Sequence, residues 1–123
     1  MKTVETIKRK TITIDATEKS LGRLAAEVAC FLRGKNKPDF VPYKDMGDIV
    51  VIKNVEKMKF TGDKLEQKNY FRFTGYLGNL KEQTLKEFLI KKGHKEVLRK
   101  AIMGMLPKNK LRDRQITHLK FEK

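Results

Sequence analysis

The sequence predicts an α/β fold, a three-layer domain with a small, mainly parallel central sheet flanked by helices and a basic C-terminal extension. Three observations lead to this prediction. The chain has 123 residues, the size of one domain. Its apolar residues alternate near the N-terminus and then recur with helical spacing. A strand, a helix and a second strand follow in order, and such a unit favours a right-handed crossover with parallel pairing.

Each part of this first unit has a recognisable pattern. Thr11–Asp15 alternates Thr with Ile, which is typical of a strand with one apolar face. The helix is predicted from a cap at Ser20 to about Arg33, with Gly34 just beyond its end. Ile49–Ile52 is a continuous β-branched run, which favours a strand buried on both faces. The helix carries an apolar stripe formed by Leu21, Leu24, Ala25, Val28 and Leu32.

Two further strands are predicted in the middle of the chain. Met58–Thr61 and Asn69–Thr74 both alternate in the way that strands do. The second of them places Tyr70 and Arg72 on one face and two phenylalanines on the other. Gly75–Asn79 then forms a loop, in which Tyr76 either stacks on an unpaired base or packs back on the sheet.

The last third of the chain is predicted to be helical. Thr84 and Glu87 have the spacing of a capping box, and Gly93 ends the short helix that follows. A second helix covers about His94 to Leu106, and Pro107 stops it. Its apolar stripe consists of Val97, Leu98, Ala101, Ile102 and Met105. We therefore predict a single domain over residues 1–123, with an N-terminal extension at 1–10 and a basic C-terminal exit at 107–123.

The charge of the chain points to a polyanionic partner. There are 29 Lys and Arg against 15 Asp and Glu, which gives a net charge of +14. Residues 91–123 alone hold eleven basic and three acidic residues, whereas a merely solvated face mixes both signs. Gly104 interrupts an otherwise well-patterned helix, which indicates close approach of either another helix or RNA. These features favour a nucleic-acid-binding protein.

Several classes of function are not expected. The chain has one cysteine, Cys30, and two histidines, so neither an intramolecular disulfide nor a Cys/His metal site is predicted. No apolar run approaches the ~18 residues of a membrane span, and residues 1–10 lack the apolar stretch of a signal peptide. We expect a protein of the reducing cytoplasm with no cofactor, no metal and no small-molecule substrate.

Two alternative functions compete with this interpretation. Asp15, Asp45 and Asp48 together have the chemistry of a Mg²⁺-dependent nuclease, although each also suits a turn or a strand entrance. A membrane-surface protein is the second alternative, and it requires an apolar helix face open to lipid. The sequence contains neither a P-loop nor a dinucleotide-binding glycine pattern.

Six short motifs occur in a fixed order along the chain. They are Asp15–Thr17 with Leu21–Ala25, Leu32–Pro38, Gly47–Asn54, Thr61–Gly62, Tyr70–Tyr76 and Gly104–Leu111. In this order and spacing they resemble the universal family of large-subunit ribosomal protein thirteen, in its bacterial-type form. The resemblance covers roughly Thr11 to Leu119.

The resemblance implies a structural constituent of the large ribosomal subunit. Such a protein binds large-subunit rRNA, supports assembly by bridging RNA segments, contacts neighbouring ribosomal proteins and performs no catalysis. Its RNA-facing elements look like the turn at Arg33–Lys37, the strand and loop at Tyr70–Gly78, and the helix end and exit at Lys100–Arg114. The residues expected to contact rRNA are Arg23, Arg33, Lys35, Asn36, Lys37, Lys44, Arg72, Thr74, Gly75, Tyr76, Gly78, Arg99, Lys100, Gly104, Lys108, Asn109, Lys110, Arg112 and Arg114.

Overall fold

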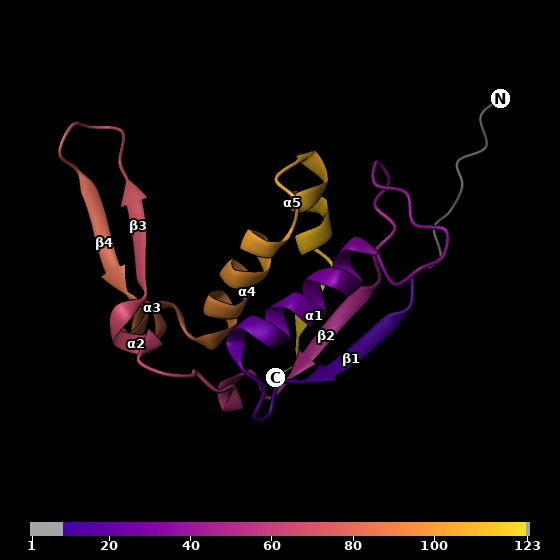
Figure 1. Cartoon of the computed structure of the whole chain (residues 1–123), viewed down its shortest axis with the longest axis horizontal. Helices are drawn as coiled ribbons and strands as arrows, with labels where there is room; N and C mark the ends of the chain where they lie inside the picture. Colours follow the sequence, from indigo (N-terminus) through magenta and orange to yellow (C-terminus); the bar gives the residue numbers. More distant parts are fainter. Residues whose placement is uncertain (1–8, 123) are drawn as a thin grey trace.

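A computed structural model describes residues 9–122 of the chain (Figure 1). The predicted N-terminal extension at 1–10 therefore lies mostly outside the described residues. The elements are β1 (Thr11–Asp15), α1 (Leu21–Arg33), β2 (Ile49–Lys53), the 3-10 helix η1 (Val55–Lys57), α2 (Lys64–Gln67), β3 (Asn69–Phe73), β4 (Leu80–Thr84), α3 (Leu85–Lys92), α4 (His94–Met105), α5 (Lys110–Ile116) and β5 (Leu119–Phe121).

The central sheet is small and parallel, in the order β1-β2-β5. This confirms the predicted α/β class. In β2, Val50 and Ile52 are fully buried, whereas Ile49 and Val51 on the other face are only partly buried. The prediction that this strand is buried on both faces is therefore wrong. The physical reason is that the core gathers on the face of the sheet toward α1, where Ile14 of β1 is also buried.

The core forms between the sheet, α1 and α4, which follow one another as layers (Figure 1). The predicted stripe of α1 is buried, with Leu24 and Leu32 completely inaccessible to solvent. Across from it, Leu98 and Ile102 of α4 are equally buried. Met105 was predicted to complete the α4 stripe, but it is 47% exposed, because the buried position at this helix end belongs to Leu106. The apolar faces of these two helices are thus used by the core, which removes the open face that a membrane-surface protein requires.

The start of α1 is held by a neighbouring segment instead of by a side-chain cap. Ser20 occupies the N-cap position with extended backbone, but its side chain makes no capping hydrogen bond. Instead, the backbone N–H of Leu21 donates to the carbonyl of Lys59 at 3.2 Å, and the N–H of Lys59 donates to the carbonyl of Lys19 at 2.9 Å. The strand predicted at Met58–Thr61 is reduced to this single bridge between Ser20 and Lys59. At the other end of α1, Gly34 has a φ of 87°, as the predicted C-terminal glycine requires.

The predicted strand at Asn69–Thr74 is present, but it does not join the central sheet. It forms β3 of a separate antiparallel hairpin with β4, and this hairpin projects from the body of the domain (Figure 1). The sequence Leu80–Thr84 carries no clear alternation, which is why β4 was not predicted. The hairpin leads directly into α3, whose first turn is capped as predicted, because the Thr84 side chain accepts a hydrogen bond from the Glu87 N–H.

The C-terminal residues contain more structure than a simple basic exit. After Pro107, the chain forms α5, which packs against α1 and α4. It then returns as β5, where Leu119 pairs with Val50 of the central strand. Residues 107–122 therefore complete the sheet in addition to carrying charge.

Candidate nucleic-acid interface

The predicted RNA-facing elements project from the domain at three places. The turn at Arg33–Lys37 opens the loop at residues 34–48, and Tyr70–Gly78 lies in the hairpin at residues 69–84. Lys100–Arg114 covers the end of α4, the α4–α5 junction and the first residues of α5. In Figure 1 the loop, the hairpin tip and α5 all extend toward the upper side of the view, with the core below them. The hairpin stands apart from the other two surfaces, whereas the loop and the end of α5 meet where His118 lies 3.9 Å from Asp45.

A basic groove lies between the hairpin and the helices α3 and α4. The basic residues that line it are Arg72, Lys81, Lys91, Lys92 and Lys100; Glu87 is acidic, and Glu82, whose register places it on the other face of the hairpin, borders the groove. The floor is aromatic, with the rings of Tyr70 and Phe88 4.8 Å apart. The Lys100 ammonium lies 4.5 Å from the Tyr70 ring centroid and 5.0 Å from that of Phe88. Burial raises the pKa of the Tyr70 hydroxyl above its ordinary value of 10.

Two cations face each other across the hairpin in this groove. Arg72 of β3 pairs directly with Lys81 of β4 in the antiparallel register, and both residues are exposed. Like charges at directly opposite positions destabilise a strand pair. An anion bound between them removes that repulsion. The arrangement is therefore suited to a phosphate.

Three of the groove's cations were absent from the predicted contact residues. Lys81 was missed because β4 was not predicted, so its position across from Arg72 was not visible. Along the sequence, Lys91 and Lys92 stand out only as part of the net charge of residues 91–123. The exit of the hairpin into α3 places them beside Lys100 of α4, and no short-range pattern encodes that proximity.

The hairpin tip is an open loop. Gly75 and Gly78 have φ values of 93° and 79°, a left-handed conformation that side chains disfavour. Tyr76 between them is 73% exposed, so the alternative in which it packs back on the sheet is wrong. Thr74 donates from its hydroxyl to the carbonyl of Asn79 at 3.4 Å and closes the loop. The tip thus presents an aromatic ring that stacks on no other ring among residues 9–122.

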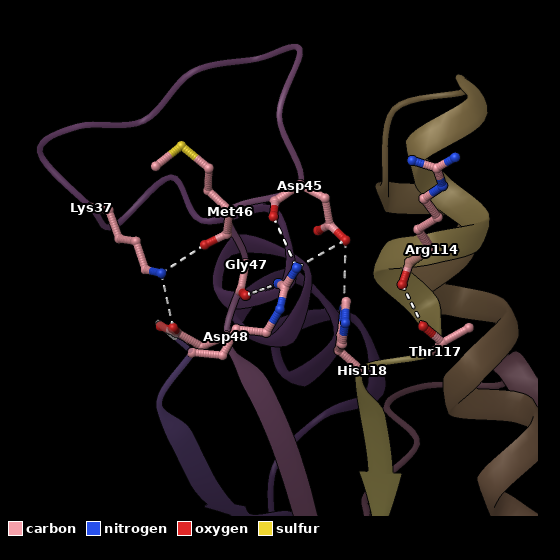
Figure 2. A network of polar contacts seen from close by, with 9 residues as sticks. Lys37, Asp45, Met46, Gly47, Asp48, Arg114, Thr117 and His118 are labelled. Atoms are coloured by element: carbon pink, nitrogen blue, oxygen red, sulfur yellow. Dashed lines mark hydrogen bonds and ion pairs between the residues drawn. The ribbon is translucent and has the colours of Figure 1, made fainter. Parts of the chain in front are cut away.

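Partly buried ion pairs hold the base of the 34–48 loop (Figure 2). The Lys37 ammonium lies 3.0 Å from the Asp48 carboxylate and donates to the Met46 carbonyl at 2.7 Å. The Asp48 side chain also accepts from the backbone N–H of Lys10 at 3.1 Å. Arg9 donates to the Gly47 carbonyl and lies 3.3 Å from the Asp45 carboxylate. The charge of Lys37 is therefore engaged within the protein, where it positions the loop.

The remaining predicted loop residues stand further out. The Arg33 guanidinium lies 5.4 Å from the centroid of the Phe40 ring. Lys35, Asn36 and Lys44 are exposed on the loop. Arg23 sits near the opposite end of α1, roughly 15 Å from Arg33 along the helix axis, so the structure does not bring it to this surface.

His118 joins α5 and β5 to the same network (Figure 2). Its Nδ1 is 3.9 Å from the Asp45 carboxylate. Burial lowers the pKa of His118 below 6.5; Arg9 and Lys120 lower it further, whereas Asp45 opposes them. The folded protein therefore binds this proton less readily than the unfolded chain does.

This pKa shift predicts a pH-dependent stability. The contribution of His118 is fully present above pH 6.5, and it is lost as the pH falls from there toward the lowered folded pKa. We expect His118→Gln to flatten this part of the curve of unfolding free energy against pH. Urea unfolding of both proteins from about pH 8 to about pH 5 measures the difference. Parallel curves for the two proteins would contradict the prediction.

The α4–α5 junction exposes several predicted contact residues together. Lys108, Lys110 and Arg114 are exposed, and Arg99 is exposed on α4. Asn109 instead caps α5, because its side chain accepts from the Arg112 N–H at 3.2 Å. Gly104 is exposed, and a Cβ built there meets no described atom within 4 Å. Close approach of another helix therefore does not explain this glycine within the described chain.

The acidic residues of the nuclease alternative are not assembled. Asp48 precedes the first residue of β2, whereas Asp15 ends the parallel strand β1, roughly 15 Å further along the sheet. The Asp15 carboxylate accepts from the Thr17 N–H at 2.9 Å, from the Thr17 hydroxyl and from Asn54, which lowers its pKa to about 2. Its assignment to a turn is confirmed. Among residues 9–122 no group of three or more metal-ligating side chains occurs.

These observations define a class of protein: a small structural α/β domain whose cations stand on a hairpin, a loop and a helix junction. The chain belongs to the ribosomal protein L13 family, since the family model described as Ribosomal protein L13 matches residues 9–121. It is thus a ribosomal protein with a structural role and not an enzyme. None of the described helices is long and apolar enough to cross a membrane.

Relatives from bacteria support the same family. The chain is 49% identical to the large ribosomal subunit protein uL13 of Nitratidesulfovibrio vulgaris, over 96% of this chain and 81% of that protein. It is 51% identical to the uL13 of Clostridioides difficile, over 93% and 79% of the two chains. It is 52% identical to that of Lawsonia intracellularis, over 94% and 80%.

Proposed function

We propose that the chain is a structural constituent of the large ribosomal subunit that binds large-subunit rRNA and supports assembly by bridging RNA segments. The observation that carries the proposal is the basic groove, in which Arg72 and Lys81 face each other next to Lys100. A cluster of like charges at this density is costly until a polyanion neutralises it. The names of the bacterial relatives place those proteins in the large subunit.

The proposed mechanism combines charge neutralisation with rigid positioning. Lys and Arg side chains displace counterions from phosphates, and this release supplies sequence-independent affinity. The groove, the hairpin tip and the loop at residues 34–48 stand on one core, so RNA segments bound to them are held at fixed distances. Tyr76 at the tip offers a ring on which an unpaired base can stack. In this proposal the partners are rRNA and neighbouring ribosomal proteins, and the location is the ribosome in the cytoplasm.

Sedimentation of a lysate from the native host tests this function. The lysate is centrifuged through a sucrose gradient in high salt, and the chain is quantified in each fraction by mass spectrometry. We expect it in the large-subunit fractions at about one copy per particle. RNase treatment of those fractions is expected to release it. A chain that stays at the top of the gradient would show that the proposed function is wrong.

A further inference from the structure

The hairpin has a second face, and two of its residues, Phe71 and Glu82, also border the basic groove. In the antiparallel register, Phe73 lies directly opposite Leu80, and Phe71 lies directly opposite Glu82. Directly opposite residues and their neighbours two positions away share one face of a strand pair. Phe71, Phe73 and Leu80 are 60%, 63% and 59% exposed. Together they present on the order of 300 Å² of apolar surface, an extent that commonly marks a binding site.

Charge is divided between the two faces of the hairpin. Arg72 and Lys81 lie on the face toward α3 and α4, where Tyr70 packs against Phe88. On the apolar face, Glu82 is the one charged residue among the described hairpin residues at positions 69–73 and 80–84. The ribbon is therefore cationic on one side, and apolar with a single carboxylate on the other.

This division decides which kind of macromolecule fits the apolar face. Surfaces that stack nucleic-acid bases combine aromatic rings with cations along the backbone. Here a carboxylate stands beside Phe71, and it repels a phosphate chain. Apolar side chains with a cation opposite Glu82 are what a protein partner supplies. A two-stranded ribbon is also only marginally stable in water, and contact on its second face stabilises it.

We propose that the face formed by Phe71, Phe73, Leu80 and Glu82 docks a neighbouring protein of the large subunit, through an apolar patch bearing a Lys or Arg that meets Glu82. The inference rests on the proposed function, since it takes place on the assembled particle. The hairpin then lies between two partners, with rRNA in the basic groove and protein on the apolar face.

Photo-cross-linking from the two faces tests this docking. The chain is expressed in its native host with p-benzoylphenylalanine in place of Phe73, or in place of Arg72 as the matched control on the opposite face. Large subunits are purified, irradiated and digested, and the adducts are identified by mass spectrometry. We expect the probe at position 73 to link to a peptide of another ribosomal protein. The probe at position 72 is expected to link to rRNA.

A second variant tests the charge pairing. Glu82→Lys in the position-73 background is expected to reduce the peptide adduct at least about threefold.

The outcomes separate the two proposals. An rRNA adduct at position 73, or no adduct there while position 72 still links to rRNA, would overturn the protein docking and leave the proposed function standing. An unchanged peptide adduct in the Glu82→Lys variant would overturn the charge pairing. Absence of the unsubstituted chain from the large-subunit fractions would instead contradict the proposed function itself, and the docking with it.

Discussion

Replacing Gly47 with alanine is expected to destabilise the domain by about 3 kcal/mol or more, because the new methyl group has no space. A Cβ at this position would lie 1.6 Å from the carbonyl oxygen of Leu32 and 2.4 Å from its carbonyl carbon. These are backbone atoms of a fully buried residue in α1, so they cannot rotate aside. The N–H of Asp48 also donates to the Phe31 carbonyl at 3.1 Å, which fixes the chain against the helix. Urea unfolding measures the loss.

Gly104→Ala is the matched control for this substitution. Its Cβ would meet no described atom within 4 Å, and the residue lies inside α4. We expect that variant to be more stable than the original protein by up to ~1 kcal/mol, because alanine is the better helix former. Equal stability of Gly47→Ala and the original protein would show that the base of the 34–48 loop adapts. The loop would then not depend on the close contact between Gly47 and α1.

The second large effect is expected in the basic groove. Replacing Arg72 and Lys81 together with alanine is expected to weaken binding to purified large-subunit rRNA by about 100-fold at low salt, since two charge-assisted contacts are lost. The plot of log affinity against log salt concentration is expected to become shallower by roughly 1.5, which corresponds to two phosphate contacts. Fluorescence anisotropy across a salt series measures both quantities.

If Arg72 and Lys81 instead stabilised the fold, replacing them would lower the free energy of unfolding. Because the two cations repel each other across the strands, their removal is not expected to lower the unfolding free energy. Lys57→Ala with Lys59→Ala removes the same charge from exposed positions between β2 and α2, and serves as the control. Equal loss of affinity in both double variants would show that net charge alone determines binding. The groove would then have no particular role.

The residues predicted to contact RNA differ in how accessible the structure leaves them, and their contacts with RNA stay predictions. Arg72, Tyr76 and Lys100 stand where an RNA can reach them, and their roles remain predictions. Lys37 has the right charge in the right loop, but Asp48 engages it, and the sequence does not reveal an ion pair across eleven positions in an irregular segment. Asn109 has a polar side chain that caps α5. The sequence shows which residues are cations. Whether a cation can contact RNA depends on the residues that surround it in the folded structure.

The sequence by itself determined the α/β class, α1 with its closing glycine, the parallel pairing of β1 and β2, and the family. These features depend on local periodicity, on helix-end chemistry and on the order of motifs, all of which are written along the chain. The tertiary structure alone decided that β3 leaves the sheet, that β5 completes it, and that Lys81 stands across from Arg72. Those features depend on contacts between residues distant in the chain, where packing outweighs local propensity.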